Sequence, residues 1–188
     1  KGDDPNFRPV DMEFAPDGSL FLIDWHNVLI GHMQHNARDP LRDHVHGRIY
    51  RITYPGRPLI RPASVAGAPI DTLLNNLRLP EYRSRYRSRR ELRGRSADVV
   101  LPALRNWWKQ LDQTDPNYEQ WLLEGLWVSW GMNQIDEELL QAVLTATDHR
   151  VRAGGVRVLR YMHHQIDSAD ALFQAAALDP HGRHAFAD

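Results

Sequence analysis

The spacing of apolar residues changes once along this chain of 188 residues, and that change constrains the fold more than any other feature. Up to Gly56 the apolar residues alternate with polar ones or form short runs, a pattern typical of strands. From Leu73 onward they recur at helical spacing, in longer stretches separated by short polar breaks. Residues 55–69 contain four prolines and two glycines, which end the last strand and predict a linker. The sequence therefore predicts an antiparallel β segment followed by an α-helical domain.

Three short strands are predicted in the β segment, at residues 10–14, 20–25 and 48–54, with a turn at residues 16–18. So few strands do not form a stable sheet in water, because both edges and one face would be exposed. We therefore expect this sheet to be part of a larger β structure whose other strands precede Lys1. The chain has no initiator methionine and ends just after a helix-start signal, so we expect it to be a fragment.

Two of the polar breaks in the helical part resemble each other. Asp148–Arg152 aligns with Asp179–Arg183 at a spacing of 31 residues, and Arg85–Leu92 aligns with Arg152–Leu159 at 67, about twice that spacing. A repeated helix pair with Asp at the turn and Arg in the next first turn is typical of HEAT-like solenoids. There the Asp caps the second helix and accepts hydrogen bonds from an Arg of a neighbouring repeat. Two adjacent glycines at 154–155, inside a predicted helix, indicate that a neighbouring helix approaches closely.

Composition and charge exclude several functional classes. The chain has no cysteine, so it has no disulfide, no thiolate metal site and no covalently attached c-type haem of its own. Its formal net charge is −1 and no stretch approaches the ~20 apolar residues of a membrane span, so we expect neither a nucleic-acid partner nor a spanning helix. Eight arginines lie between Arg78 and Arg95 and alternate with Tyr82, Tyr86 and Leu92. This mixture favours an amphipathic repeat helix with a solvated or salt-bridged face over a phosphate-binding stripe.

The connection between Trp25 and Gly47 is long for a hairpin and contains five of the ten histidines when His26 is counted. If the flanking strands are antiparallel neighbours, Asp24 at the end of one lies beside His46 and Arg48 near the start of the other. Residues two apart on a strand project from the same face, so His44 and His46 would point the same way. The sequence thus predicts a polar site at one end of the sheet.

Three interpretations of this histidine loop stay open. Two strand histidines and a carboxylate are a set that can bind a divalent metal, and a cofactor could contact the same end of the sheet. The histidines could instead form a structural network with Asp24, Asp39 and Asp43. One of them could also act as a general base, since the pKa of histidine lies near ~6.5. The candidate residues are Asp24 and Arg48 for a cofactor, and His32, His35, His44 and His46 for a metal.

Several stretches of the chain resemble known proteins. The run Phe7–Gly18 resembles a blade of glucose/sorbosone dehydrogenase-type β-propellers. Other stretches are similar to a group of large exported bacterial proteins described as membrane-bound dehydrogenases or haem-binding proteins. In the loop region these are Asp24-Trp25-His26-Asn27, Gly31–His35, Arg38-Asp39-Pro40 and Arg42–Arg51, and in the helical part Leu122–Trp127 and Arg150–Arg160. In that family a propeller is followed by HEAT-like repeats and often by a c-type cytochrome domain.

The resemblance implies a domain organisation for this chain. Residues 1–56 would be the closing part of a β-propeller, 57–69 a linker, and 70–188 a HEAT-like helical solenoid truncated at its C-terminus. It also implies a periplasmic or extracellular location. The expected partners are the missing propeller segment of the same protein and a cytochrome domain or another electron-transfer partner.

The resemblance further implies a fragment of an exported redox protein, a quinone- or haem-linked dehydrogenase acting on sugars or alcohols. Its active site would lie largely outside these residues, and the quinone or c-type haem would be held by other parts of the protein. The alternative is a non-catalytic binding or scaffold protein that uses its propeller and HEAT-like surfaces for protein–protein interaction. A bound quinone or metal at the histidine loop would favour the enzyme, and an occupied concave helical surface would favour the scaffold.

Overall fold

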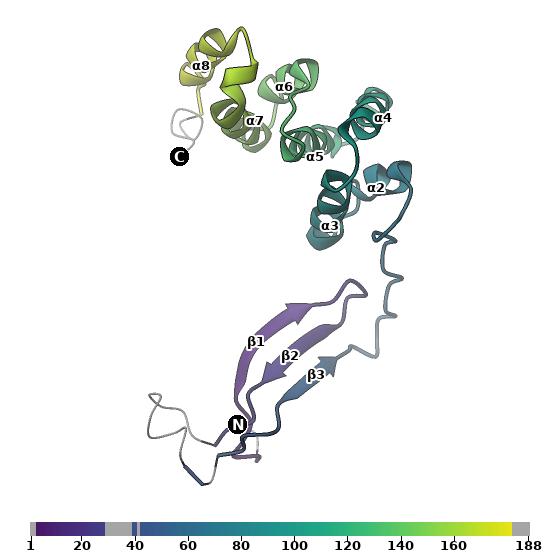
Figure 1. The fold of residues 1–188 in the computed structure, drawn as a ribbon, viewed down its shortest axis with the longest axis vertical. Coiled ribbons are helices and arrows are strands. Elements are labelled where there is room, and N and C mark those ends of the chain that lie inside the picture. The colour runs from purple at the N-terminus through teal and green to yellow at the C-terminus, as the bar shows by residue number, and fades with distance from the viewer. Residues whose placement is uncertain (1–2, 29–38, 41, 182–188) are drawn as a thin grey trace. The chain divides into compact units, whose positions relative to one another are not determined.

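The computed structural model describes residues 3–28, 39–40 and 42–181. The chain divides into two compact units, Lys1–Pro62 and Ala63–Asp188. The first contains an antiparallel sheet and the second is helical (Figure 1). The β segment and the α-helical domain predicted from the change of apolar spacing are thus both confirmed.

The sheet has three strands within the described part of the first unit: β1 (Pro9–Phe14), β2 (Leu20–Asp24) and β3 (Arg48–Ile52). They pair antiparallel in the order β1-β2-β3, so β1 and β3 are the edge strands of this sheet. The turn between β1 and β2 contains Gly18 at a φ of 84°, which glycine adopts without strain.

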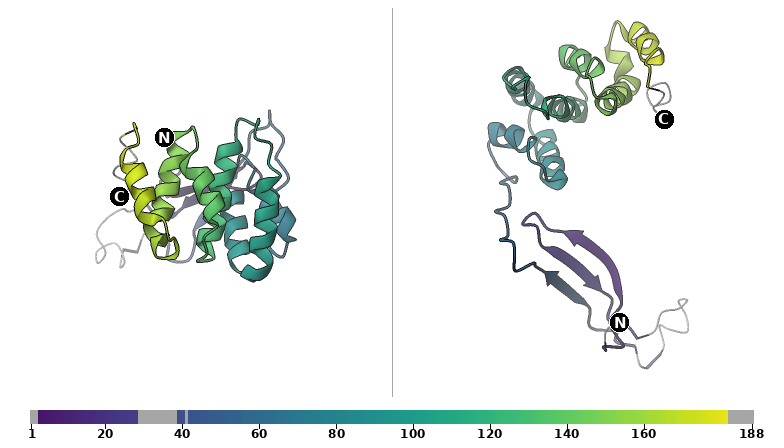
Figure 2. Two further views of the ribbon diagram at one scale, coloured as in Figure 1. Left: turned by 90° about the horizontal axis from the view of Figure 1, so that it is seen from above. Right: turned by 180° about the vertical axis from the view of Figure 1, so that it is seen from behind.

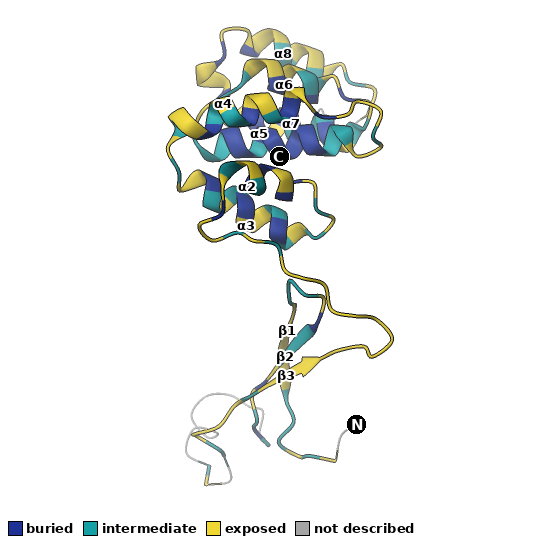
Figure 3. Ribbon diagram, turned by 90° about the vertical axis from the view of Figure 1, so that its right-hand side faces the viewer, coloured by how far each residue is buried: buried dark blue, intermediate teal, exposed yellow. Residues whose placement is uncertain are grey.

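One face of the sheet is apolar and exposed. The register places Leu22 between Met12 and Tyr50, and Leu20 between Phe14 and Ile52. The side chains of Met12 and Phe14 are 65% and 64% exposed, and the strands are coloured mostly as exposed or intermediate in Figure 3. Within the described part of the first unit, no apolar layer covers this face.

Seven α-helices and one short 3-10 helix make up the described part of the second unit. They are α2 (Ile70–Asn76), α3 (Tyr82–Arg93), α4 (Ala97–Lys109), α5 (Tyr118–Gly131), α6 (Glu137–Leu144), α7 (His149–Met162), η1 (His163–Gln165) and α8 (Ala169–Ala177). In the described ranges no helix is both long and apolar enough to cross a bilayer.

The helices form two layers, with α2, α4, α6 and α8 on one side and α3, α5 and α7 on the other (Figures 1 and 2). The core lies between the layers, and α5 packs against α3, α4, α6 and α7. Leu122 and Leu126 of α5 are buried, and so is Glu124 on the same helix. A helix buried on most sides is apolar nearly all round, which explains the sequence of α5.

The predicted repeat has a structural basis in two equivalent arginines, Arg85 and Arg152, each in the first turn of its helix. Each donates from Nη1 to the two carbonyl oxygens five and six residues earlier, and from Nε to a carboxylate. The carbonyls are those of Leu79 and Pro80 (2.8 and 2.7 Å) for Arg85 and of Ala146 and Thr147 (both 2.8 Å) for Arg152. The carboxylates are Glu124 (2.9 Å) and Asp179 (2.7 Å), respectively.

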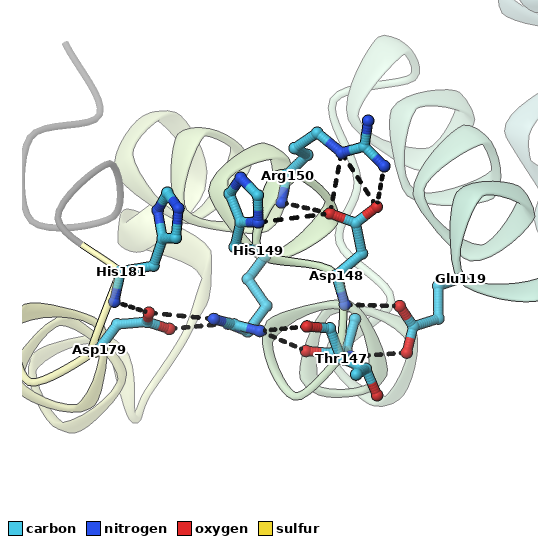
Figure 4. A network of polar contacts seen from close by, with 9 residues as sticks. Glu119, Thr147, Asp148, His149, Arg150, Asp179 and His181 are labelled. Atoms are coloured by element: carbon cyan, nitrogen blue, oxygen red, sulfur yellow. Dashed lines mark hydrogen bonds and ion pairs between the residues drawn. The ribbon is translucent and has the colours of Figure 1, made fainter.

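The predicted cap of α7 is also present. Asp148 accepts a hydrogen bond of 2.8 Å from the backbone N–H of Arg150, and its own backbone N–H donates to Glu119 at 2.8 Å (Figure 4). The Arg150 guanidinium and backbone N–H lower the pKa of Asp148 to about 2. The turn before α7 is therefore tied both to its own helix and to α5.

Candidate functional site

The end of the sheet brings Asp24 and Arg48 together. They are directly opposite each other in the β2–β3 register, as the predicted antiparallel pairing requires. Asp24 is buried, and its Oδ1 accepts from the backbone N–H groups of Arg8 (2.7 Å) and His26 (2.9 Å). Its Oδ2 lies 3.7 Å from Arg48 Nη1. Burial raises the pKa of Asp24, but these N–H donors and the charge of Arg48 outweigh it and leave the pKa below its usual value.

Arg48 is the centre of a wider polar cluster. Its Nη1 donates to Asp4 and, at 3.0 Å, to the hydroxyl of Tyr50. Its Nη2 lies 3.3 Å from Nε2 of His26. His26 has a φ of 52°, in the left-handed region that non-glycine residues seldom adopt and that often marks a functional or tightly constrained position.

Asp43 holds two imidazoles. Its Oδ2 lies 2.8 Å from Nδ1 of His46 and 3.3 Å from Nε2 of His26. Its Oδ1 accepts from the backbone N–H groups of Val45 and His46, both at 2.9 Å. These backbone donors, with the His46 ring, hold the pKa of Asp43 well below its usual range, so the carboxylate stays ionised.

The two histidines differ in exposure. The side chain of His26 is 12% exposed, whereas that of His46 is 71% exposed with its Nδ1 bound to Asp43. An imidazole held at one nitrogen by a carboxylate has a fixed orientation and keeps its other nitrogen available for a proton or a metal. His46 can therefore accept a proton at Nε2 from a molecule in solution.

His44, another predicted metal ligand, is not part of this cluster. His44 is exposed, and its side chain makes no hydrogen bond or ion pair to another described residue. It precedes β3 together with His46, so the two-residue alternation of a strand does not apply to them. His32 and His35 lie outside the described residues.

A metal set is not assembled by the residues that the structure describes. Within 3–28, 39–40 and 42–181, no group of three or more His, Asp or Glu side chains is arranged to hold a metal ion. The metal and cofactor roles assigned from the sequence stay predictions.

Buried polar atoms at this end of the sheet have unused hydrogen-bonding capacity. Arg8 Nε, Asp24 Oδ2 and His26 Nδ1 are enclosed without a hydrogen-bond partner among the described residues. Unpaired buried polar atoms are costly, so they are usually satisfied by water or by further protein groups. The cluster is therefore a place where additional polar groups are expected.

A family model matches the part of the chain that contains the sheet. Residues 1–56 match a family model described as Domain of unknown function (DUF7133). No curated protein and no solved structure matches the chain. The matched residues contain all three strands and the histidine loop, but the family description names no activity.

Sequence reasoning did not single out Asp4 and Arg8, and it counted His26 in the histidine loop without assigning it a role of its own. The left-handed backbone of His26 has no sequence signature, and Asp4 is 44 residues from its partner Arg48. The position of His26, two residues after the strand-end Asp24, was the one available signal.

Proposed function

We propose that residues 1–56 are the closing part of a β-propeller in an exported, dehydrogenase-like redox protein, with the helical unit as a spacer. The observation that carries the proposal is the pair of Asp43 and His46, joined at 2.8 Å with the imidazole exposed at the end of the sheet. A location outside the cytoplasm, in the periplasm or beyond the cell, is part of the same proposal.

The apolar face of the sheet supports the propeller assignment. Met12, Phe14 and Ile52 are exposed on one face, where a second layer would normally cover them. Blades of a propeller pack face to face around a central axis. We assign the neighbouring blade of the same protein as the occupant of this face.

Oxidation of a hydroxyl to a carbonyl requires the hydroxyl proton to leave and the carbon to give up a hydride. His46 would take the proton at Nε2, and ionised Asp43 would stabilise the resulting imidazolium. Substrates with a secondary or anomeric hydroxyl, as in sugars and alcohols, fit this chemistry.

A quinone, when bound, would supply the two-electron acceptor for this hydride, and a c-type haem elsewhere in the protein would then take the electrons one at a time. Arg48 fits the carbonyl oxygens of a quinone because a guanidinium offers several N–H donors. Asp24 is buried behind it and would orient Arg48 without touching the ligand. Of the two residues predicted to contact a cofactor, Arg48 would bind it directly and Asp24 would act through Arg48.

The test uses the longer exported protein that this proposal predicts, assayed on sugars and alcohols with an artificial electron-accepting dye. Because general-base catalysis contributes about 10²–10⁴-fold, His46→Ala should lower kcat/KM by at least about 100-fold, with partial rescue by added imidazole. Asp43→Asn should lower it as well. His164→Ala, an exposed histidine of the helical unit, serves as the matched control.

The outcomes separate the open interpretations. Equal losses in His44→Ala and His46→Ala, together with loss on chelation, would indicate a metal site. Unchanged kcat/KM and an unchanged pH profile in His46→Ala and Asp43→Asn would refute the proposal. The alternative, a non-catalytic binding or scaffold protein, would then stand.

A further inference from the structure

The helical unit contains a groove that the proposed redox function does not use. It has a volume of about 750 Å³ and is lined by residues of α3, α5 and α7, the layer opposite α2, α4, α6 and α8 (Figure 1). Its lining includes four arginines, Arg89, Arg90, Arg93 and Arg157, and, among the residues that the structure describes, no carboxylate.

Most of the positive charge in the groove is not neutralised. Arg89 forms an ion pair with Glu124, but Glu124 also pairs with Arg85, so one negative charge is shared by two arginines. Arg90, Arg93 and Arg157 are exposed and make no ion pair with another described residue. The groove therefore carries an excess of positive charge in a chain whose formal net charge is −1.

Aromatic rings orient two of the guanidinium groups. Cζ of Arg89 lies 5.1 Å from the ring centroid of Trp127 and 5.7 Å from that of Tyr82. Cζ of Arg90 lies 5.8 Å from the ring centroid of Tyr86. A guanidinium placed over a ring keeps its N–H edge available, and that edge binds carboxylates in bidentate fashion.

The same rings are poorly placed to stack on nucleic-acid bases. Tyr82 and Tyr86 stack on each other at 6.3 Å and 22°, and Trp130 stacks on Tyr161 at 5.6 Å and 23°. Their faces are thus shared among themselves and with arginines, whereas single-stranded nucleic acids bind through open aromatic faces. These contacts favour carboxylates as the bound groups.

The spacing of the arginines fits an extended peptide. Arg89 and Arg93 are four residues apart on α3, one helical turn and a rise of about 6 Å. Alternate side chains of an extended strand point the same way about 6.6 Å apart. The face of α3 from Tyr82 to Arg93 spans about 16 Å, the length of about five extended residues.

We propose that this groove binds an extended acidic segment of a partner protein, with Asp or Glu at alternate positions. Arg89 and Arg93 would take successive carboxylates, Arg90 would bind beside them, and Arg157 of α7 would bind from the opposite wall. The proposal is independent of the redox function, since it concerns only residues of the helical unit.

The probe is a labelled eight-residue peptide of alternating Glu and Ser, with binding to the 188-residue chain followed by fluorescence anisotropy at low salt. The test variant is Arg90→Ser/Arg93→Ser/Arg157→Ser, which removes the three exposed arginines of the groove and keeps Arg89 paired with the buried Glu124. Arg87→Ser is the matched control, because Arg87 is exposed on α3 but does not line the groove. Circular dichroism and the urea midpoint establish that each variant is folded.

We expect the triple variant to weaken binding by about 30-fold, since each lost ion pair at an exposed site is worth about threefold and the three effects multiply. Arg87→Ser should change binding by less than about twofold, and a peptide with Lys in place of Glu should not bind. The proposal is overturned if Arg87→Ser weakens binding as much as the triple variant, or if the Glu peptide does not bind at 1 mM. Tighter binding of a single-stranded oligonucleotide, lost in the triple variant, would also overturn it and indicate a nucleic-acid groove.

Discussion

Replacing Glu124 tests the most deeply buried charge in the helical unit. Glu124 is fully buried in α5 and binds Arg85 Nε at 2.9 Å and Arg89 Nη1, two arginines whose side chains are only 18% and 13% exposed. Glu124→Gln keeps the size of the side chain and removes its charge. Two largely buried guanidiniums would then lack a counter-charge.

Removing one member of a buried ion pair typically costs about 3–5 kcal/mol. The two arginines retain some access to water, and Gln keeps one acceptor oxygen, so we expect about 3 kcal/mol here. That is a large share of the roughly 5–15 kcal/mol that stabilises an ordinary domain. The free energy of unfolding would be measured by urea titration of the whole chain, followed by circular dichroism at 222 nm, which reports the helices.

Glu138→Gln is the matched control, because Glu138 also binds two cations, Arg105 (2.8 Å) and Lys109 (2.9 Å). Glu138 and Arg105 are 51% and 53% exposed, so this variant should lose less than about 1 kcal/mol. Raising the salt to 1 M should reduce the effect at Glu138 and leave most of the effect at Glu124. Equal losses at the two positions, below about 1 kcal/mol, would refute the reasoning.

Three further substitutions have effects set by local contacts. Gly155→Ala should lower the free energy of unfolding by about 1 kcal/mol or more, because the new Cβ would lie 2.9 Å from Cγ1 of the stiff Val143 side chain. Gly131→Ala should raise the free energy of unfolding by up to about 1 kcal/mol, because its Cβ would meet nothing closer than 4.0 Å. A gain in stability for both variants in urea titrations would contradict this. Asp148→Asn keeps the cap of α7 but loses the ion pair to Arg150. The pKa of Asp148 is about 2 in the folded protein, below its ordinary 3.8. The variant should therefore be less stable than the original protein by a constant amount above about pH 4, and this difference should disappear as the pH falls toward 2. A difference in urea titrations that does not change with pH would exclude the ion pair as its source.

The helical unit was largely predictable because its signals are local or periodic. The repeated Arg85 and Arg152 make equivalent contacts, and the glycines at 154–155 lie against Leu123, Val143 and Leu144 as the close-approach interpretation required. Asp148 caps α7 as expected. Each of these follows from spacing along one or two helices, which the sequence displays directly.

The polar cluster was less predictable because its contacts join distant segments. Antiparallel pairing was enough to place Asp24 beside Arg48. A histidine network with Asp24, Asp39 and Asp43 was one interpretation of the sequence, but nothing singled out Asp43 as the carboxylate beside His46 and His26, because residues 42–47 follow no strand or helix period. Loop geometry depends on backbone conformations, such as the left-handed His26, that many residue types can adopt.

Arginines 78–95 divide into two groups that composition does not distinguish. Arg85 and Arg95 bind carbonyls and carboxylates of the helical unit itself, whereas Arg90 and Arg93 are exposed on the groove side of α3. The sequence favoured a solvated or salt-bridged face, and both kinds of environment occur within one helix. The decisive residue is Glu124, which lies far along the chain and supplies one carboxylate for two arginines.

Glu124 therefore links the stability of the helical unit to the charge of its groove. Removing its negative charge leaves Arg89 uncompensated beside the proposed peptide site, so Glu124→Gln should tighten binding of the Glu/Ser peptide by about threefold while it destabilises the fold. Stability and affinity would then change in opposite directions. If Glu124 instead acts mainly by orienting Arg89, binding would weaken together with stability, and Arg89→Ser would weaken it to the same extent. Anisotropy titrations of the two variants, made below their urea midpoints, distinguish charge compensation from positioning.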